Sequence, residues 1–182
     1  LEGRGSVAAE FGVDVGLSDA FAFEGGAVGS GDGDVGDLDL TAANFEGSLD
    51  HRLVGHRGHD VFVGAHAGGE NFGDGGIGDD VLFGGTGADV LIGGENRDRA
   101  QYSESLTAVT VDLAVSSNNT GEAIGDSYNS IEDLAGSRFD DDLRGDTGAN
   151  RLFGREGADI LNGREGSDYL NGGAHIDTLD GG

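Results

Sequence analysis

The hydrophobic positions of the chain recur with a nine-residue period over two stretches, residues 55–101 and 136–182. Each unit carries one large apolar residue at position eight, among glycines and polar residues. These apolar residues are Phe62, Leu82, Leu91, Leu143, Leu152, Leu161, Leu170 and Leu179, with Ala100 as the weak member. The pattern predicts that the last three residues of each unit form a short strand whose central side chain points inward. The register slips by two over residues 64–74, and residues 46–54 keep the phase weakly.

The first six residues of each unit read G-G-x-G-x-D and predict a turn. Position six is occupied by Asp60, Asp80, Asp89, Asp98, Asp141, Asn150, Asp159, Asp168 and Asp177. Glycines at positions one, two and four permit positive φ angles, so that backbone carbonyls can point at a cation inside the turn. The aspartate adds a hard carboxylate oxygen, the ligand that Ca²⁺ prefers. Two units make one coil, and we expect coils to stack about 4.8 Å apart as parallel strands.

Asp and Gly are also the commonest turn formers, so these residues alone could be structural. Their recurrence at one position of nearly every unit favours calcium binding instead. With this repeat, the chain resembles the RTX (repeats-in-toxin, haemolysin-type) calcium-binding nonapeptide family over residues 55–101 and 136–182. The resemblance implies an all-β fold, a right-handed parallel β-roll, here as two short rolls joined by a short β-containing linker.

The resemblance also implies where calcium would bind: between one turn and the turn eighteen residues later. The earlier turn gives the carbonyls of positions two and four and its Asp, and the later turn gives the carbonyls of positions one and three and its Asp. The first set is Gly76, Gly78 and Asp80 with Gly93, Glu95 and Asp98, and the second is Ser137, Phe139 and Asp141 with Gly154, Glu156 and Asp159. The third set is Asp146, Gly148 and Asn150 with Gly163, Glu165 and Asp168, and the fourth is Arg155, Gly157 and Asp159 with Gly172, Ala174 and Asp177.

Three departures from the pattern modify these expectations. Asn150 puts an amide where the others have a carboxylate, so the third set should bind more weakly. Phe139 and Asn96 replace the glycine of position four, which affects the local turn geometry. Asp89 is a further candidate ligand, but Thr107 stands eighteen residues later, outside the repeats, so Asp89 is expected to lack an in-phase partner at that spacing.

The same pattern suggests four regions. Residues 1–45 are an acidic loop or the end of a preceding β domain, and residues 46–101 form the first roll. Residues 102–135 interrupt the repeats as a linker or cap, in which Val109, Val111 and Leu113 alternate as one half-buried strand. Residues 136–182 form the second roll, whose last unit is cut at Gly182.

Composition narrows the possible partners. Ten Lys and Arg against 35 Asp and Glu give a formal charge of −25, which argues against nucleic acid and anionic membranes and for cations. Glycine takes 38 positions. The chain contains no cysteine, so disulfides and thiolate metal sites are excluded. No apolar run approaches the roughly 18 residues of a transmembrane segment.

Two other groups of polar residues could bind metals. Asp32, Asp34, Asp37 and Asp39 resemble an EF-hand loop, but Ala43 stands where the bidentate Glu is needed, so we expect a solvated loop. His51, His56, His59 and His66 cluster in the sequence without an HExxH motif, and we expect no zinc site from them.

These features predict a non-catalytic calcium-binding module of a secreted bacterial protein. Extracellular calcium would fill sites of the ~10⁻⁴–10⁻³ M class, so the chain would fold after export, and the resemblance suggests the type I secretion machinery as a partner. The alternatives are an accessory region of a secreted enzyme (a serralysin-like protease, a lipase or a mannuronan epimerase) or of a surface adhesin. No nucleophile lies in a recognisable catalytic motif such as GxSxG.

Overall fold

The computed structural model describes residues 28–30, 39–41, 51–55, 57–64 and 69–182. The expectations for most of residues 1–45, and for His56 and His66, lie outside the described residues. Among the described residues, no helix has the length and apolar character needed to cross a membrane.

The regular secondary structure of the described part of the chain consists almost entirely of short strands. They are β1 (Val28–Ser30), β2 (Asp39–Thr41), β3 (His51–Val54), β4 (Val61–Val63), β5 (Asn71–Ile77), β6 (Val81–Phe83), β7 (Val90–Glu95), β8 (Arg99–Gln101), β9 (Thr110–Asp112), β10 (Ser127–Asn129), β11 (Asp133–Ala135), β12 (Asp142–Arg144), β13 (Arg151–Arg155), β14 (Ile160–Asn162), β15 (Tyr169–Gly173) and β16 (Thr178–Asp180). Two 3-10 helices, η1 (Ser116–Asn118) and η2 (Gly121–Ala123), lie between β9 and β10.

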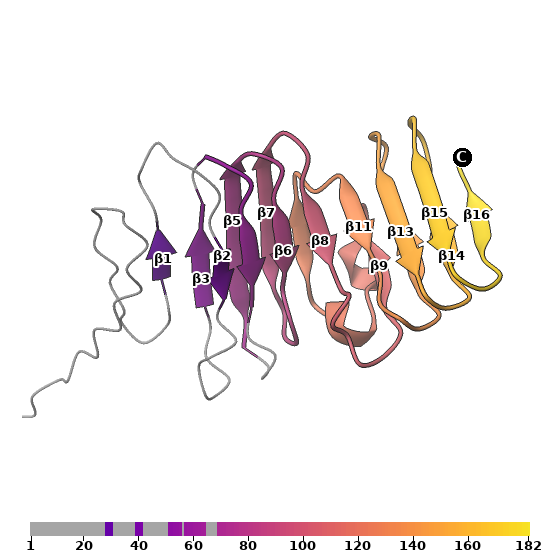
Figure 1. Cartoon of the computed structure of the whole chain (residues 1–182), viewed down its shortest axis with the longest axis horizontal. Helices are drawn as coiled ribbons and strands as arrows, with labels where there is room; N and C mark the ends of the chain where they lie inside the picture. Colours follow the sequence, from indigo (N-terminus) through magenta and orange to yellow (C-terminus); the bar gives the residue numbers. More distant parts are fainter. Residues whose placement is uncertain (1–27, 31–38, 42–50, 56, 65–68) are drawn as a thin grey trace, which may run out of the picture.

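The strands form parallel sheets that face each other along one elongated molecule (Figure 1). One side is a seven-stranded sheet in the order β15-β13-β11-β8-β6-β4-β2. The other side consists of a five-stranded sheet, β1-β3-β5-β7-β10, and a four-stranded sheet, β16-β14-β12-β9. The chain crosses from one side to the other after nearly every strand, which confirms the predicted parallel β-roll.

The strand register follows the nine-residue period. Val81 pairs with Arg99, and Leu143 pairs with Leu161, so a coil within the repeats contains eighteen residues. Phe62 pairs with Leu82, twenty positions later, which is the predicted slip of two residues. Two nonapeptides therefore make one coil, as the sequence predicts.

The core lies between the two sides and is made by the position-eight residues. Phe62, Leu82, Leu91, Leu143, Leu152 and Leu161 are fully or almost fully buried. Each coil therefore buries about two large apolar side chains, a thin core for so many ordered glycines. At the last coil Leu170 is only partly buried and Leu179 is exposed.

Residues 102–135 contribute strands to the roll between the two repeat blocks. β11 pairs with β8 on one side and with β13 on the other, so both repeat blocks share the seven-stranded sheet. The predicted strand in this segment is present as β9, with Val109 and Val111 buried. Tyr102 is buried and belongs to the same core cluster as the position-eight leucines of both blocks.

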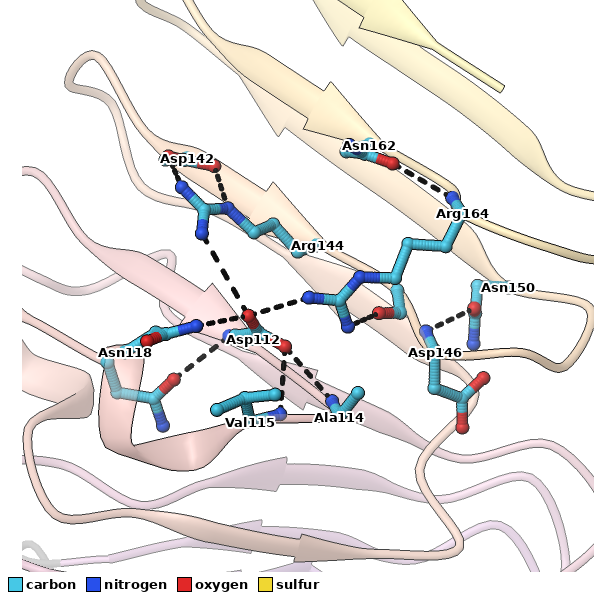
Figure 2. A network of polar contacts seen from close by, with 12 residues as sticks. Asp112, Ala114, Val115, Asn118, Asp142, Arg144, Asp146, Asn150, Asn162 and Arg164 are labelled. Atoms are coloured by element: carbon cyan, nitrogen blue, oxygen red, sulfur yellow. Dashed lines mark hydrogen bonds and ion pairs between the residues drawn. The ribbon is translucent and has the colours of Figure 1, made fainter. Parts of the chain in front are cut away.

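An ion-pair network joins this segment to the second block (Figure 2). The Asp112 side chain is fully buried, and Arg164 donates to it at 2.7 Å from 52 positions away. Val115 donates its backbone N–H (2.9 Å), Asn118 its side-chain amide (2.8 Å), and Arg144 lies 3.9 Å away. Burial alone would raise the pKa of Asp112, but the donors outweigh it, Arg164 foremost, and lower that pKa.

We expect Asp112→Asn to lower the free energy of unfolding by about 2 kcal/mol at pH 7, because the amide loses charge-assisted hydrogen bonds. The pKa of Asp112 is lower in the folded protein than in the unfolded chain. Its contribution is therefore full above about pH 4 and is lost as pH falls through the lowered pKa. Thermal melts in calcium-containing buffer should show a difference from wild type that is largest at pH 7 and shrinks in acid. A difference independent of pH would contradict this account.

Candidate metal centre

The turns of the roll lie along two edges, where the chain crosses between the sheets. The first edge carries the turns that lead into the seven-stranded sheet, and the second edge carries those that leave it. Along the first edge the position-six residues are Asp60, Asp80, Asp98, Asn150 and Asp168, and along the second edge they are Asp89, Asp141, Asp159 and Asp177. Each edge therefore presents a column of acidic side chains, one for nearly every coil.

Hydrogen bonds connect the members of each column. The backbone N–H of Asp80 donates to Oδ1 of Asp98 at 2.8 Å. The N–H of Asp141 donates to Oδ1 of Asp159 at 2.8 Å, and the N–H of Asp159 donates to Oδ1 of Asp177 at 3.0 Å. Residues eighteen positions apart thus contact each other directly, which is the spacing that the predicted sets require.

The second carboxylate oxygen has a different environment. Oδ2 of Asp80, Asp89, Asp98, Asp159 and Asp168 is buried and accepts no hydrogen bond. An unpaired buried carboxylate oxygen costs several kcal/mol unless a cation or proton compensates it. In these five turns the repeat thus leaves one carboxylate oxygen available to a ligand inside the protein.

The unpaired oxygens of Asp80 and Asp159 lie beside a backbone carbonyl of the next coil. A Cβ on Gly75 would overlap Oδ2 of Asp80 and stand 2.6 Å from the carbonyl oxygen of Gly93. A Cβ on Gly154 would likewise overlap Oδ2 of Asp159 and stand 2.6 Å from the carbonyl oxygen of Gly172. Glycine at position one is needed because a carboxylate and a carbonyl converge beside it. Two kinds of hard oxygen at one point suit Ca²⁺.

Burial makes five aspartates of the columns hold protons more strongly than free carboxyl groups do. It raises the pKa of Asp80 and Asp159 to about 6 and that of Asp98 to about 7, with neighbouring carboxylates adding to the effect. Burial also raises the pKa of Asp89 and Asp141. The negative charges of these carboxylates therefore repel one another near neutral pH without enough positive charge nearby. A divalent cation would reduce this repulsion.

The turns adopt two conformations. Positions two and four both have positive φ in the turns that begin at Gly75, Gly84, Gly93, Gly154, Gly163 and Gly172. Neither position does in turns 136–141 and 145–150. In these two turns the N–H of Ser137 donates to Oδ2 of Asp141 (2.5 Å), and the N–H of Asp146 donates to Oδ1 of Asn150 (2.9 Å). The side-chain oxygen that faces the next coil is already satisfied there.

This difference separates the four predicted sets, whose members the structure stacks in adjacent coils. The first and fourth sets start from a turn with an unpaired Oδ2, that of Asp80 or Asp159. The second and third start from turns in which a backbone N–H satisfies position six. Asn96 keeps the left-handed conformation of position four with φ 89°, whereas Phe139 does not adopt it.

Some predicted carbonyl ligands already bond between coils. The N–H of Gly78 donates to the carbonyl of Glu95 (3.1 Å), and the N–H of Ala174 donates to the carbonyl of Arg155 (2.7 Å). A carbonyl oxygen has two lone pairs, so each can still accept a second interaction.

Asp89 has a partner that the sequence analysis missed. Its N–H donates to Oδ1 of Asp126 (2.9 Å), which lies 37 positions later and not at the eighteen-residue spacing of the repeats. Oδ2 of Asp126 accepts a hydrogen bond from the hydroxyl of Tyr102 (2.7 Å), unlike the unpaired oxygens of the repeats. The signal was present as GEAIGDSYN from Gly121, a degenerate nonapeptide with Asp at position six and Tyr128 at position eight.

Side chains alone do not form a metal cluster in the part of the chain that the structure describes. There, no group of three or more His, Asp or Glu side chains comes together to hold an ion. His59 lies on the first edge, and its Nδ1 is 3.1 Å from the backbone nitrogen of Asp79. The predicted sets do not require such a cluster, because each takes four of its six ligands from backbone carbonyls.

Comparison with known families agrees with this arrangement. Residues 67–100, 135–170 and 154–182 match the model of the RTX calcium-binding nonapeptide repeat, in four copies. The matched segments include the turns of all four predicted sets and stop at the interruption. A search among curated proteins gave no match.

Proposed function

Because the chain belongs through its repeats to the RTX calcium-binding nonapeptide repeat family, we propose that it is the calcium-binding module of a secreted bacterial protein and that it folds around its ions after export. The observation that carries the proposal is the row of buried aspartate oxygens without hydrogen-bond partners. Those of Asp80, Asp98 and Asp159 lie beside a backbone carbonyl of the next coil. The roll is a structural module in this proposal, and any catalytic activity belongs to other parts of the parent protein.

The four predicted sets are the proposed sites, and they differ in strength. The first and fourth sets are the tighter sites, because Asp80 and Asp159 each offer an oxygen without a competing donor. The second and third sets are weaker, because a backbone N–H must be displaced from Asp141 or Asn150 before an ion can bind there. Asn150 further weakens the third set by removing one negative charge.

The proposed export of the chain is consistent with the calcium affinity expected of such sites. Sites of the ~10⁻⁴–10⁻³ M class fill at extracellular calcium concentrations and stay empty at cytosolic ones. A chain that is unfolded in the cytosol is a suitable substrate for type I secretion, which we propose as its route.

Isothermal titration with calcium tests the proposal. We expect binding in two classes, with the first and fourth sets in the tighter one. The double variant Ser137→Gly/Phe139→Gly frees the turn 136–141 to adopt positive φ and removes the Ser137 hydroxyl from Asp141. It should strengthen one weak site about tenfold. Absence of calcium binding by the wild type would overturn the proposed function.

The control for this titration is Ser117→Gly, which makes a similar change at an exposed position of the interruption. It should leave both classes as they are. An equal gain in affinity from the control would show that glycine acts through general flexibility and not through the turn of the second set.

A further inference from the structure

The first repeat block ends on an aspartate that has no nonapeptide after it. Asp98 is fully buried, and its Oδ2 has no hydrogen-bond partner. Its turn has the conformation of the tighter sites, with φ 110° at Gly94 and 89° at Asn96. The turn beside it on the first edge is the three-residue connection 130–132, between β10 and β11.

This short connection reproduces both contacts that a full nonapeptide makes. A Cβ on Gly93 would overlap Oδ2 of Asp98 and the carbonyl oxygen of Ser130, the same convergence that Asp80 and Gly93 show at Gly75. Ser130 has a left-handed backbone, with φ 52°. Its carbonyl therefore stands in the place of the position-one carbonyl.

Glu132 takes the place of the position-six aspartate. Its Oε2 accepts the N–H of Asp98 at 3.0 Å, as Oδ1 of Asp98 accepts the N–H of Asp80 at 2.8 Å. The glutamate side chain is one methylene longer than aspartate, and the turn is three residues shorter than in the repeats. The added reach of the side chain thus compensates for the shorter turn.

The carboxylates at this junction are not neutralised by the neighbouring arginines. The guanidinium of Arg97 pairs with Asp133 at 2.7 Å, and that of Arg99 lies 3.8 Å from the same carboxylate. The buried carboxylate of Asp98 is also close enough to Asp80 and Glu132 to be repelled by their negative charges. A divalent cation beside Asp98 would offset this concentration of negative charge.

We propose that a further calcium ion binds at this junction, held by Asp98, Glu132 and the carbonyls of Gly94, Asn96 and Ser130. The proposal rests on the proposed function, since it assigns an additional site to the same roll. Two of the five ligand residues, Ser130 and Glu132, lie outside the segments that match the nonapeptide repeat. The ion would join the first block to the interrupting segment, so the calcium column of the first edge continues past the end of the repeats.

Counting bound ions by native mass spectrometry at saturating calcium tests the assignment. Glu132→Gln keeps an oxygen that can accept the N–H of Asp98 but removes the charge, and it should bind one ion fewer than wild type or bind it at least about tenfold more weakly. Asp98→Asn should lose two ions, because Asp98 also belongs to the first set. Glu104→Gln removes one charge at an exposed position of the same segment and should bind as many ions as wild type.

The outcomes separate the two proposals. If wild type binds calcium and Glu132→Gln binds the same number with the same affinity, the junction site is wrong and the proposed function stands. If Glu104→Gln loses an ion as well, the effect is one of net charge and the junction site is again wrong. If wild type binds no calcium, the proposed function fails, and the junction site fails with it.

Discussion

Excess chelator should convert this protein from a β-rich roll to a largely unfolded chain, and millimolar calcium should restore the roll. The formal charge is −25, and the columns place carboxylates of adjacent coils within hydrogen-bonding distance of one another's backbone. Each coil buries about two large apolar side chains, too few to offset the entropy of ordering the turns and their charge repulsion. Ion binding then becomes part of the folding free energy. Far-ultraviolet circular dichroism measures the change.

Two controls show whether the effect belongs to specific sites. Magnesium at the same concentration should restore little structure, because it demands short octahedral coordination and gives up its waters reluctantly. Sodium chloride at matched ionic strength screens the charges without filling the sites. Recovery of the fold by salt alone would show that general repulsion keeps the chain unfolded, and a fully β-rich spectrum in chelator would contradict the prediction outright.

The repeats could be predicted from the sequence in considerable detail because their period encodes the geometry directly. One large apolar residue in nine predicts an inward side chain, and Leu82, Leu143 and Leu161 are completely buried. The eighteen-residue coil follows from the same period and reappears in the pairing of Val81 with Arg99. Even the slip of two residues in 64–74 could be read by counting.

The interruption could not be predicted in this way, because counting fails where the loop lengths change. Asp126 accepts a hydrogen bond from the N–H of Asp89, 37 positions earlier. Glu132 accepts one from the N–H of Asp98, 34 positions earlier. The eighteen-residue spacing predicts neither of these contacts, although the degenerate nonapeptide 121–129 does carry Asp126 at position six. Only the structure shows that β10 and β11 continue the sheets and bring these carboxylates to the edges.

The turn conformations were predicted in part. Phe139 was expected to disturb its turn, and turn 136–141 does lack positive φ. Asn96 also replaces the glycine of position four and was expected to disturb its turn. It nevertheless adopts the left-handed conformation, which asparagine tolerates better than other residues with a side chain. The role of Ser137, whose N–H and hydroxyl bind Asp141, depends on the folded turn and has no signature in the repeat pattern.

The substitution with the largest expected effect on calcium affinity is Asp159→Asn. Asp159 accepts the N–H of Asp141 through Oδ1, and its Oδ2 is unpaired beside Gly154. In the proposed sites it belongs to both the second and the fourth sets, so one substitution weakens two sites. Because affinity follows the number of charged ligands, we expect the calcium midpoint of folding, followed by circular dichroism, to rise about tenfold or more.

The matched control is Asp140→Asn, one position before Asp141 in the same column of turns. Asp140 is exposed and accepts the N–H of Ala158 at 2.8 Å, so the variant loses the same charge and a comparable hydrogen bond to the next coil. It belongs to none of the proposed sets, and its midpoint should move by less than about twofold, as expected for an exposed charge. Equal shifts in the two variants would mean that calcium responds to net charge, and the assignment of ligands to stacked turns would then be wrong.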